Sequence, residues 1–554
     1  MKHLVARIHP DDNVLVALQE LPIGTPVTSN GTTVTTTERI PAKHKLALQA
    51  LAPGDAVHMY GVLVGRANSA IGAGGLLTTA NIHHATDSYD EQPPAQARAA
   101  WAAPDVSARQ GRTFQGYHRP DGRVGTANYW LVIPLVFCEN RNIAVLEEAL
   151  MSELGYGRRQ SYQPQTRELI ALLRAGKSVE EILAADLHPA GEAHQPPRLF
   201  ANVDGIRFLQ HEGGCGGIRQ DAQTLCGLLA GYITHPNVAG ATVLSLGCQN
   251  AQISMLQAEI DLRAPNGLGK PLYLLEQQQL GTEEALISAA LRQTFAGLML
   301  ANEQTRQPAP LSQLCLGLEC GGSDGFSGIS ANPTLGHVSD LLVGLGGRVI
   351  LAEFPELCGV EQELVDRSVD PATAERFSTL MKAYGDSAVA VGSGFDMNPS
   401  PGNIRDGLIT DAMKSAGAAR KGGSSPVVAV LDYPEPVVRP GLNLLCTPGN
   451  DVESTTAEVG SGATVVLFTT GLGTPTGNPI APVIKVSSNT ALARRMPDII
   501  DVNTGTIIDG EETIEEAGAR LLDYVVQVAS GEQTVAAVRH DQTDFIPWKR
   551  GVSL

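Results

Sequence analysis

The chain has 554 residues, a formal net charge of -18 and a hydrophobic fraction of 43%. This length exceeds what one compact core can hold, so the sequence predicts two to four domains of an ordinary globular protein. The acidic balance disfavours a nucleic-acid partner and a membrane surface, and no apolar run is long enough for a membrane span. Asp11 and Asp12 interrupt the first apolar run, which argues against a signal peptide and for a cytoplasmic location.

The first segment consists of short strand-like runs separated by turns, which predicts a small β domain over residues 1–89. Within it, "KHKLALQAL" (43–51) predicts a short helix. His44 lies there between Lys43 and Lys45, whose charges should lower the pKa of its imidazole and suit it to act as a neutral base. Residues 90–112 are rich in Pro, Ala and Gln without periodicity, which predicts a linker.

Beyond the linker, continuous apolar runs alternate with stretches of helical spacing. The runs cover residues 128–138, 241–248, 313–320, 347–359, 425–433 and 463–473. Such runs predict parallel sheets covered by helices on both faces, hence an α/β fold. The charged helical stretch 281–310 is the expected boundary between two α/β lobes, 113–305 and 306–554.

Reactive residues gather where these apolar runs end. The ends carry Cys138, then His211, Glu212 and Cys215, then Cys248, then Glu319, Cys320, Ser323 and Asp324, and finally Glu353 and Glu356. In open α/β sheets ligands bind at the carboxyl ends of strands. Five strand ends with soft or acidic side chains therefore indicate one site more strongly than any single motif does.

Four of the eight cysteines belong to these strand ends: Cys138, Cys215, Cys248 and Cys320. A single cysteine beside a tight turn is best interpreted as a small buried hydrophobic residue. As a group with glycine neighbours, the four thiols suit zinc, iron or an iron–sulfur cluster. Their spacing resembles no zinc finger, which disfavours a structural zinc.

Several further loops are rich in backbone donors, at 398–407, 420–425, 446–456 and 469–482. Loops that combine Gly with Ser, Thr or Asn form nests and helix N-termini that bind anions such as carboxylates. Five basic residues lie in or near these loops and could pair with an acidic substrate: Arg405, Lys414, Arg420, Lys421 and Lys485. Turn formation alone is the alternative interpretation of each loop taken singly.

One set of motifs is informative as a whole: "RPDGRVGTANYWLVIPLVFCEN", "HEGGCGG", "LSLGCQN", "LECGGSDGFSGISANP", "NPSPGN", "KGGSSPV", "PGLNLLCTPGND" and "FTTGLGTPTG". Together these motifs resemble the altronate dehydratase and galactarate dehydratase family. The N-terminal segment, with "KHKLAL" and "YGVLVGRA", is similar to the small SAF (β-clip) domain of that family. "GTANYWLV" and "FPEL" favour the altronate branch. In place of an H-x-H-N run the chain has "TTAN" (78–81), and His83 and His84 follow just downstream.

The resemblance implies a β-clip domain, two α/β lobes and dehydration of a sugar acid, D-altronate to 2-dehydro-3-deoxy-D-gluconate. It implies Fe²⁺ as cofactor, with Mn²⁺ or an iron–sulfur cluster as alternatives, and a small-molecule partner in sugar-acid catabolism; a homo-oligomer is compatible with it. The expected catalytic residues are His44, His211, Glu319 and Asp324. The expected substrate-binding residues are Lys45, Ser323, Asn332, Asn403, Lys421, Asn450, Thr474 and Lys485. The expected metal ligands are Cys138, Cys215, Cys248, Cys320, His83 and His84.

Three other functions compete with this one. Galactarate dehydration, or another hydroxy-acid lyase such as a sulfolactate sulfo-lyase, needs the same residues. A non-catalytic sugar-acid-binding protein would share the pocket, although it has no need of so many thiols and carboxylates. A nucleotide-dependent oxidoreductase is disfavoured, because no G-x-G-x-x-G stands between a strand and a helix with an acidic residue at the right distance.

Overall fold

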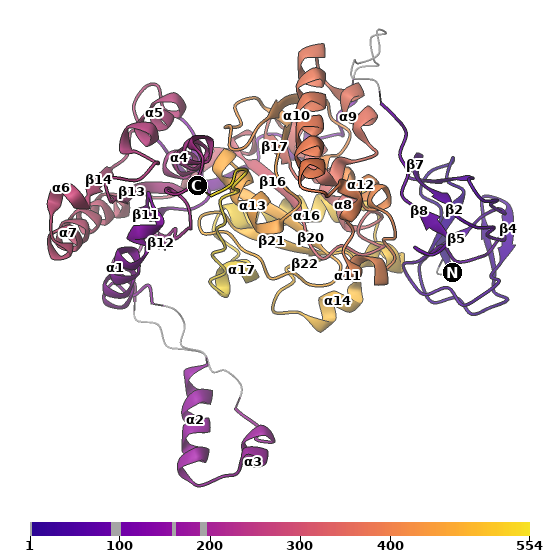
Figure 1. Cartoon of the computed structure of the whole chain (residues 1–554), viewed down its shortest axis with the longest axis horizontal. Helices are drawn as coiled ribbons and strands as arrows, with labels where there is room; N and C mark the ends of the chain where they lie inside the picture. The colour runs from indigo at the N-terminus through magenta and orange to yellow at the C-terminus, as the bar shows by residue number, and fades with distance from the viewer. Residues whose placement is uncertain (1–2, 90–100, 158–161, 189–196, 554) are drawn as a thin grey trace.

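The computed structural model describes residues 3–89, 101–157, 162–188 and 197–553. Figure 1 shows a small β domain at one end, a large sheet in the middle and a smaller sheet at the other end. The predicted α/β architecture with an N-terminal β domain is confirmed. Much of the predicted linker, residues 90–100, lies outside the described residues, as do 158–161 and 189–196 of the segment between the first helix and the second strand of the first lobe.

The N-terminal β domain is built from short antiparallel strands. They are β1 Val5–Ala6, β2 Val14–Ala17, β3 Pro26–Ser29, β4 Thr32–Thr35, β5 Lys45–Ala47, β6 Ala56–Met59, β7 Val62–Ala67 and β8 Ile82–His83. The predicted helix over 43–51 is wrong, because its centre forms β5 and pairs with β2. Leu46 and Ala47 are fully buried in this pairing, so tertiary packing outweighs the helical preference of the segment.

The smaller α/β sheet has the order β12-β11-β13-β14 and is entirely parallel. Its strands are β11 Tyr129–Pro134, β12 Gly205–Phe208, β13 Val238–Ser245 and β14 Leu272–Glu276. Helices α1 (Asn140–Glu153) and α7 (Glu283–Asn302) pack on one face, where Trp130 and Val132 are buried. Helices α4 (Arg219–Thr234) and α5 (Ile253–Arg263) lie on the other side of the sheet, so both faces are covered as the sequence predicts.

The larger sheet has the parallel order β18-β19-β17-β16-β20-β21-β22. Its strands are β16 Cys315–Cys320, β17 Arg348–Leu351, β18 Val427–Leu431, β19 Gly441–Leu445, β20 Val465–Thr470, β21 Val483–Ser487 and β22 Val502–Asn503. Helices α8 (Ala331–Gly344) and α16 (Ile514–Ala529) pack together, and α8 contacts β17, β19 and β20. Helix α13 (Asp451–Ser461) packs against β16 and also against α4 of the other lobe.

The chain order of the larger sheet creates a switch point beside β16. From β16 the chain passes to β17 on one side, then to the edge strand β18 and back inward to β19, and later crosses to β20 on the other side of β16. Connections that diverge from neighbouring strands leave a crevice at the carboxyl ends of those strands, and ligands of open α/β sheets bind there. The stretch "GLECGGSDG" begins in β16, so it reaches this crevice.

The remaining elements connect and cover these sheets. They are β9 Thr113–His118, β10 Val124–Gly125, β15 Gln307–Pro310, α2 Gln163–Arg174, α3 Val179–Leu183, α6 Gln277–Leu280, α9 Glu361–Arg367, α10 Pro371–Ala390, α11 Pro401–Arg405, α12 Asp411–Ala418, α14 Thr490–Arg495, α15 Gly505–Asp509 and α17 Ala536–Arg539. Figure 1 shows α2 and α3 set apart from both sheets. In the described part of the chain, no helix combines the length and the apolar character that crossing a membrane requires.

Candidate active site

A buried group of charged side chains lies at the switch point, centred on Cys320 at the end of β16. The Lys421 ammonium donates to Glu353 Oε2 at 2.8 Å and lies 2.9 Å from Cys320 Sγ. The Cys320 thiol also lies 3.1 Å from Glu356 Oε2. Lys421 and Cys320 are 1% and 2% exposed, so solvent does not screen these contacts. Burying charges is favourable only when they are paired, which this arrangement achieves for Lys421 and Glu353.

A second lysine extends the group toward the surface. Lys414, on α12, donates to Glu356 Oε1 at 2.5 Å and to Asn398 Oδ1 at 3.1 Å. Burial opposes ionisation of the Glu356 carboxyl, but Lys414 and Lys421 outweigh it and lower the pKa of Glu356. Burial also opposes the charge on Lys414, and Glu356 outweighs it and raises the pKa of Lys414. Both side chains are therefore ionised at neutral pH.

Glu319 and Asp451 lie close to Glu353, and two of these three carboxyl groups have a buried oxygen without a hydrogen-bond partner. One oxygen of Glu319 accepts a 2.6 Å hydrogen bond from Ser454, while Glu319 Oε1 and Glu353 Oε1 are buried and have no hydrogen-bond partner. Glu319, Glu353 and Asp451 each place a carboxylate oxygen within 4.8 Å of the others. Burial, with Glu353 and Glu458 nearby, raises the pKa of Glu319, and burial raises that of Asp451 to about 7. Closely spaced, unpartnered oxygens are what a hard divalent cation binds.

Gly321 explains how Asp451 comes so close to β16. A Cβ atom at residue 321 would lie 2.0 Å from Asp451 Oδ2 and 2.6 Å from the Phe468 ring. Any side chain there would displace the Asp451 carboxylate. At this position, then, the absence of a side chain makes room for a neighbouring acid, and the glycine is not needed for a turn.

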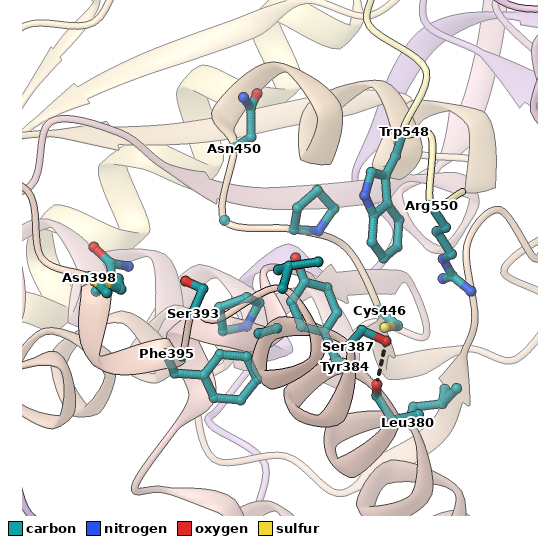
Figure 2. A pocket seen from close by; sticks show the side chains of 18 of the residues that line it. Leu380, Tyr384, Ser387, Ser393, Phe395, Asn398, Cys446, Asn450, Trp548 and Arg550 are labelled. Carbon is teal, nitrogen blue, oxygen red and sulfur yellow. Dashed lines mark hydrogen bonds between the residues drawn. The ribbon is translucent and has the colours of Figure 1, made fainter. Parts of the chain in front are cut away.

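A cavity of 730 Å³ opens beside the charged group. Figure 2 shows Asn398 and Asn450 on one side of it and Trp548 with Arg550 on the other. Asn398 lines the cavity and also contacts Glu356 and Lys414, so it connects the cavity wall to the buried ion pair. The Trp548 ring stacks on Tyr384, and apolar side chains such as Phe395 make up much of the remaining lining. An apolar lining with polar groups at a few points is typical of small-molecule sites.

The N-terminal β domain contacts the loop that follows β16 and the loop that follows α11. Lys43 Nζ lies 3.0 Å from Asp324 Oδ2 and 2.6 Å from Asp406 Oδ1, and Lys45 donates to the Gly407 carbonyl at 2.6 Å. Burial, helped by Lys45 and Lys43, lowers the pKa of His44 in the predicted direction. Burial is the larger cause, which the sequence alone did not reveal. Asp324 is fully buried, so in this structure its carboxylate holds the domains together.

Several residues expected to bind substrate have structural partners. Asn332 donates to the Gly417 carbonyl and accepts from Thr469, and Asn403 donates to the Ser323 carbonyl at 2.7 Å. Lys485 is buried, its Nζ lies 3.6 Å from the centre of the Phe468 ring, and burial lowers its pKa to about 7. Asn450 lines the cavity and caps α13, whereas Lys421 lies at the centre of the charged group. The hydroxyl of Thr474 lies 3.0 Å from where a Cβ on Gly322 would be, close to the strand-end loop.

The four cysteines expected to ligate a metal fall in two places. Cys320 is buried in the larger sheet, whereas Cys138, Cys215 and Cys248 are exposed in the loops that follow strands of the smaller sheet. His211 belongs to the smaller sheet as well. Its Nδ1 accepts from the Gly213 amide at 3.0 Å and its Nε2 contacts the Pro134 carbonyl at 2.7 Å, so neither ring nitrogen is free to take a proton. Burial lowers its pKa to about 4, which keeps the ring neutral.

The two histidines expected to ligate a metal, His83 and His84, differ in their surroundings. His83 is exposed, and its Nδ1 lies 2.5 Å from Asn68 Oδ1. His84 is half-buried at the contact with α12, where its Nδ1 accepts from the Ala412 amide at 3.3 Å. Its ring also lies close to Cys358 and Asp411, with ligand atoms within 4.8 Å of one another. The two expected ligands therefore do not share a site.

Four charged residues of the site were absent from the expected set. Glu353 and Glu356 carried a visible signal, since two glutamates follow an apolar run directly. Lys414 carried a weaker signal, as a basic residue near donor-rich loops. Asp451 carried none, because it belongs to an ordinary helical segment that only the tertiary fold brings to β16. Their recognition depends on spatial proximity rather than on a local pattern.

Three family models match consecutive parts of the chain. Residues 3–85 match the altronate/galactarate dehydratase SAF domain, residues 116–302 the D-galactarate dehydratase/altronate hydrolase second domain, and residues 311–553 the D-galactarate/altronate dehydratase C-terminal domain. An altronate dehydratase of Escherichia coli (strain K12) is 35% identical over 99% of both chains, and one of Bacillus subtilis (strain 168) is 31% identical over 99% of both. A galactarate dehydratase (L-threo-forming) of E. coli is 31% identical over 95% of this chain and 93% of its own.

Proposed function

Since the chain belongs to the D-galactarate/altronate dehydratase family, we propose that it is a hydro-lyase whose substrate is D-altronate and whose product is 2-dehydro-3-deoxy-D-gluconate. The observation that carries the proposal is the buried group of Glu353, Glu356, Lys414 and Lys421 beside a cavity large enough for a six-carbon acid. Two altronate dehydratases that match over 99% of the chain favour this substrate over galactarate.

The reaction removes a proton next to the substrate carboxylate, and the hydroxyl group on the following carbon takes up a proton and leaves as water. The enol that results tautomerises to the 2-keto acid. Glu356 suits the first step, because Lys414 keeps its carboxylate ionised and Asn398 connects it to the cavity. Loss of the proton places negative charge on the substrate carboxylate oxygens. The ammonium groups of Lys414 and Lys421 stabilise that charge in a site shielded from water, where electrostatic stabilisation is strongest.

Fe²⁺ is the proposed cofactor, and Glu319, Glu353 and Asp451 would hold it. The donor set fits, because all three offer carboxylate oxygens within 4.8 Å of one another and two of these residues have a buried oxygen without a partner. When bound, a divalent cation supplies Lewis acidity that stabilises the enediolate charge and the departing hydroxyl. Mn²⁺ prefers similar oxygen ligands and would fit the same residues.

The experiment is a panel of aldonates and aldarates offered to protein purified without oxygen and supplied with Fe²⁺, with 2-keto acid formation as readout. D-altronate should give the highest kcat/KM. Turnover of galactarate alone would replace the proposed substrate with the alternative one. No turnover of any acid would instead support a sugar-acid-binding protein.

A variant pair tests the role of Glu356. Glu356→Gln should lower kcat by about 10²–10⁴-fold, the usual contribution of a positioned general base. Glu375→Gln, on the exposed surface of α10, is the matched control and should leave kcat unchanged. Equal kcat values in both variants would exclude Glu356 as the proton acceptor.

A further inference from the structure

Three cysteines follow three neighbouring strands of the smaller sheet. Cys138 lies in the 3-10 turn Phe137–Glu139 after β11, Cys215 lies in the loop after β12, and Cys248 lies three residues beyond the end of β13. The order β12-β11-β13 is parallel, so the three strands end at the same edge. The three thiols therefore gather at that edge, although 110 residues of sequence separate the first from the last.

Backbone hydrogen bonds join the three loops directly. The Phe137 amide donates to the Gly213 carbonyl at 3.0 Å, and the Ala251 amide donates to the Gly214 carbonyl at 3.0 Å. The loop that carries Cys215 is thus held between the other two. Gly214 has φ +96, and a Cβ there would lie 2.4 Å from the Leu135 carbonyl, so a glycine is required for this close approach.

The exposure of these three thiols is unusual. Of the eight free cysteines, Cys138, Cys215 and Cys248 are the exposed ones, while the others are buried or half-buried. Free cysteine is among the most buried residue types in proteins. Core packing does not explain three exposed thiols in loops that are hydrogen-bonded to one another. Ligation of a metal centre would account for them.

The three thiols are not drawn together as a single ion would require. Over the described ranges, these cysteines do not appear in any set of three ligand atoms lying within 4.8 Å of one another. A single ion would require them to draw together. An iron–sulfur cluster is several atoms wide and takes thiolate ligands from more widely spaced positions.

The surroundings leave room for such a group and for a ligand beside it. A cavity of 680 Å³ adjoins Cys215 and is also lined by Asn140, Asn250 and Lys549. His211 stabilises the loop that carries Cys215, since its ring bridges the Pro134 carbonyl and the Gly213 amide. Lys549 brings one positive charge to the lining of this cavity, and Glu212 and Asp221 bring two carboxyl groups.

We propose that Cys138, Cys215 and Cys248 hold a [4Fe–4S] cluster at the carboxyl edge of the smaller sheet. Three protein thiolates leave one of its irons without a cysteine ligand, open to an oxygen ligand of a small hydroxy acid in the 680 Å³ cavity. The centre is distinct from the carboxylate group on the larger sheet. It does not depend on the assignment of Glu319, Glu353 and Asp451 as ligands of Fe²⁺.

The test measures iron, acid-labile sulfide and the electron paramagnetic resonance spectrum of the full chain, purified and reconstituted without oxygen. Wild-type protein should hold about four irons and four sulfides per chain in the cluster. Cys138→Ser, Cys215→Ser and Cys248→Ser should each lose at least nine-tenths of the sulfide. Cys446→Ala, a buried thiol of the other lobe, is the control and should retain it.

Three results would overturn the proposal: a wild type that reconstitutes without sulfide, serine variants that keep the cluster, or zinc as the bound metal. Circular dichroism separates loss of the cluster from loss of the fold. Turnover of altronate by a protein that binds iron but no sulfide would reject the cluster and leave the proposed activity standing. A protein that contains sulfide but turns over no acid would support the cluster and reject the proposed activity.

Discussion

Replacing Lys421 by Met should destabilise the larger sheet strongly. Lys421 is 1% exposed, and its ammonium contacts both Glu353 and Cys320. Its removal leaves the Glu353 carboxylate buried without a countercharge, and loss of one partner of a buried pair costs about 3–5 kcal/mol. At 1.36 kcal/mol per factor of ten, the opening equilibrium should rise by about 10²–10⁴-fold.

Native-state hydrogen exchange of the β16 and β17 amides measures this change in metal-free protein. It is preferable to a global unfolding curve, because a chain with several lobes need not unfold in a single transition. Lys382→Met, on the exposed side of α10, is the control and should alter exchange little. The double variant Lys421→Met/Glu353→Gln should recover most of the loss. Wild-type exchange in the single variant, or no recovery in the double variant, would refute the argument that the buried charge requires pairing.

Three further variants test other contacts. Burial lowers the pKa of Lys45 from 10.5 to about 7, so between these pH values Lys45 loses its proton when the protein folds, and the stability of the wild type should rise with pH. The stability advantage of wild type over Lys45→Met should therefore grow by up to about 3 kcal/mol from pH 7 to pH 9. A constant difference between the two proteins in β5 hydrogen exchange would contradict this. Gly321→Ala places a Cβ 2.0 Å from Asp451 Oδ2 and should displace that carboxylate. The affinity for Fe²⁺, measured by calorimetry, should fall at least about tenfold while the circular dichroism spectrum stays unchanged. An unchanged Fe²⁺ affinity in the variant would show that Asp451 is not a ligand. Lys43→Ala removes the 3.0 Å contact to Asp324 and should speed exchange of the Gly407 amide, whereas wild-type exchange would mean that the domains dock without this ion pair.

Much of the architecture follows from local sequence pattern. Unbroken apolar runs such as "YWLVIP" and "CLGLEC" predicted parallel strands, and both lie fully buried between covering helices. A strand buried on both faces needs apolar side chains at every position, so the pattern and the environment correspond directly. For the segment 43–51 the local pattern gave the wrong prediction, because the pairing of three of its residues with β2 outweighed a weak helical preference.

Sequence alone also determined that reactive side chains stand at strand ends, because the end of an apolar run marks the end of a strand. It could not determine which ends meet. Cys320 and the three thiols of the smaller sheet share the same local pattern, yet the chain places them on different sheets. Only the tertiary structure brought Lys414 and Asp451, each from a helix distant in sequence, to the end of β16. Local pattern reports whether a side chain is buried, whereas its charged partners depend on the order of strands in the sheet, which no short stretch of residues encodes.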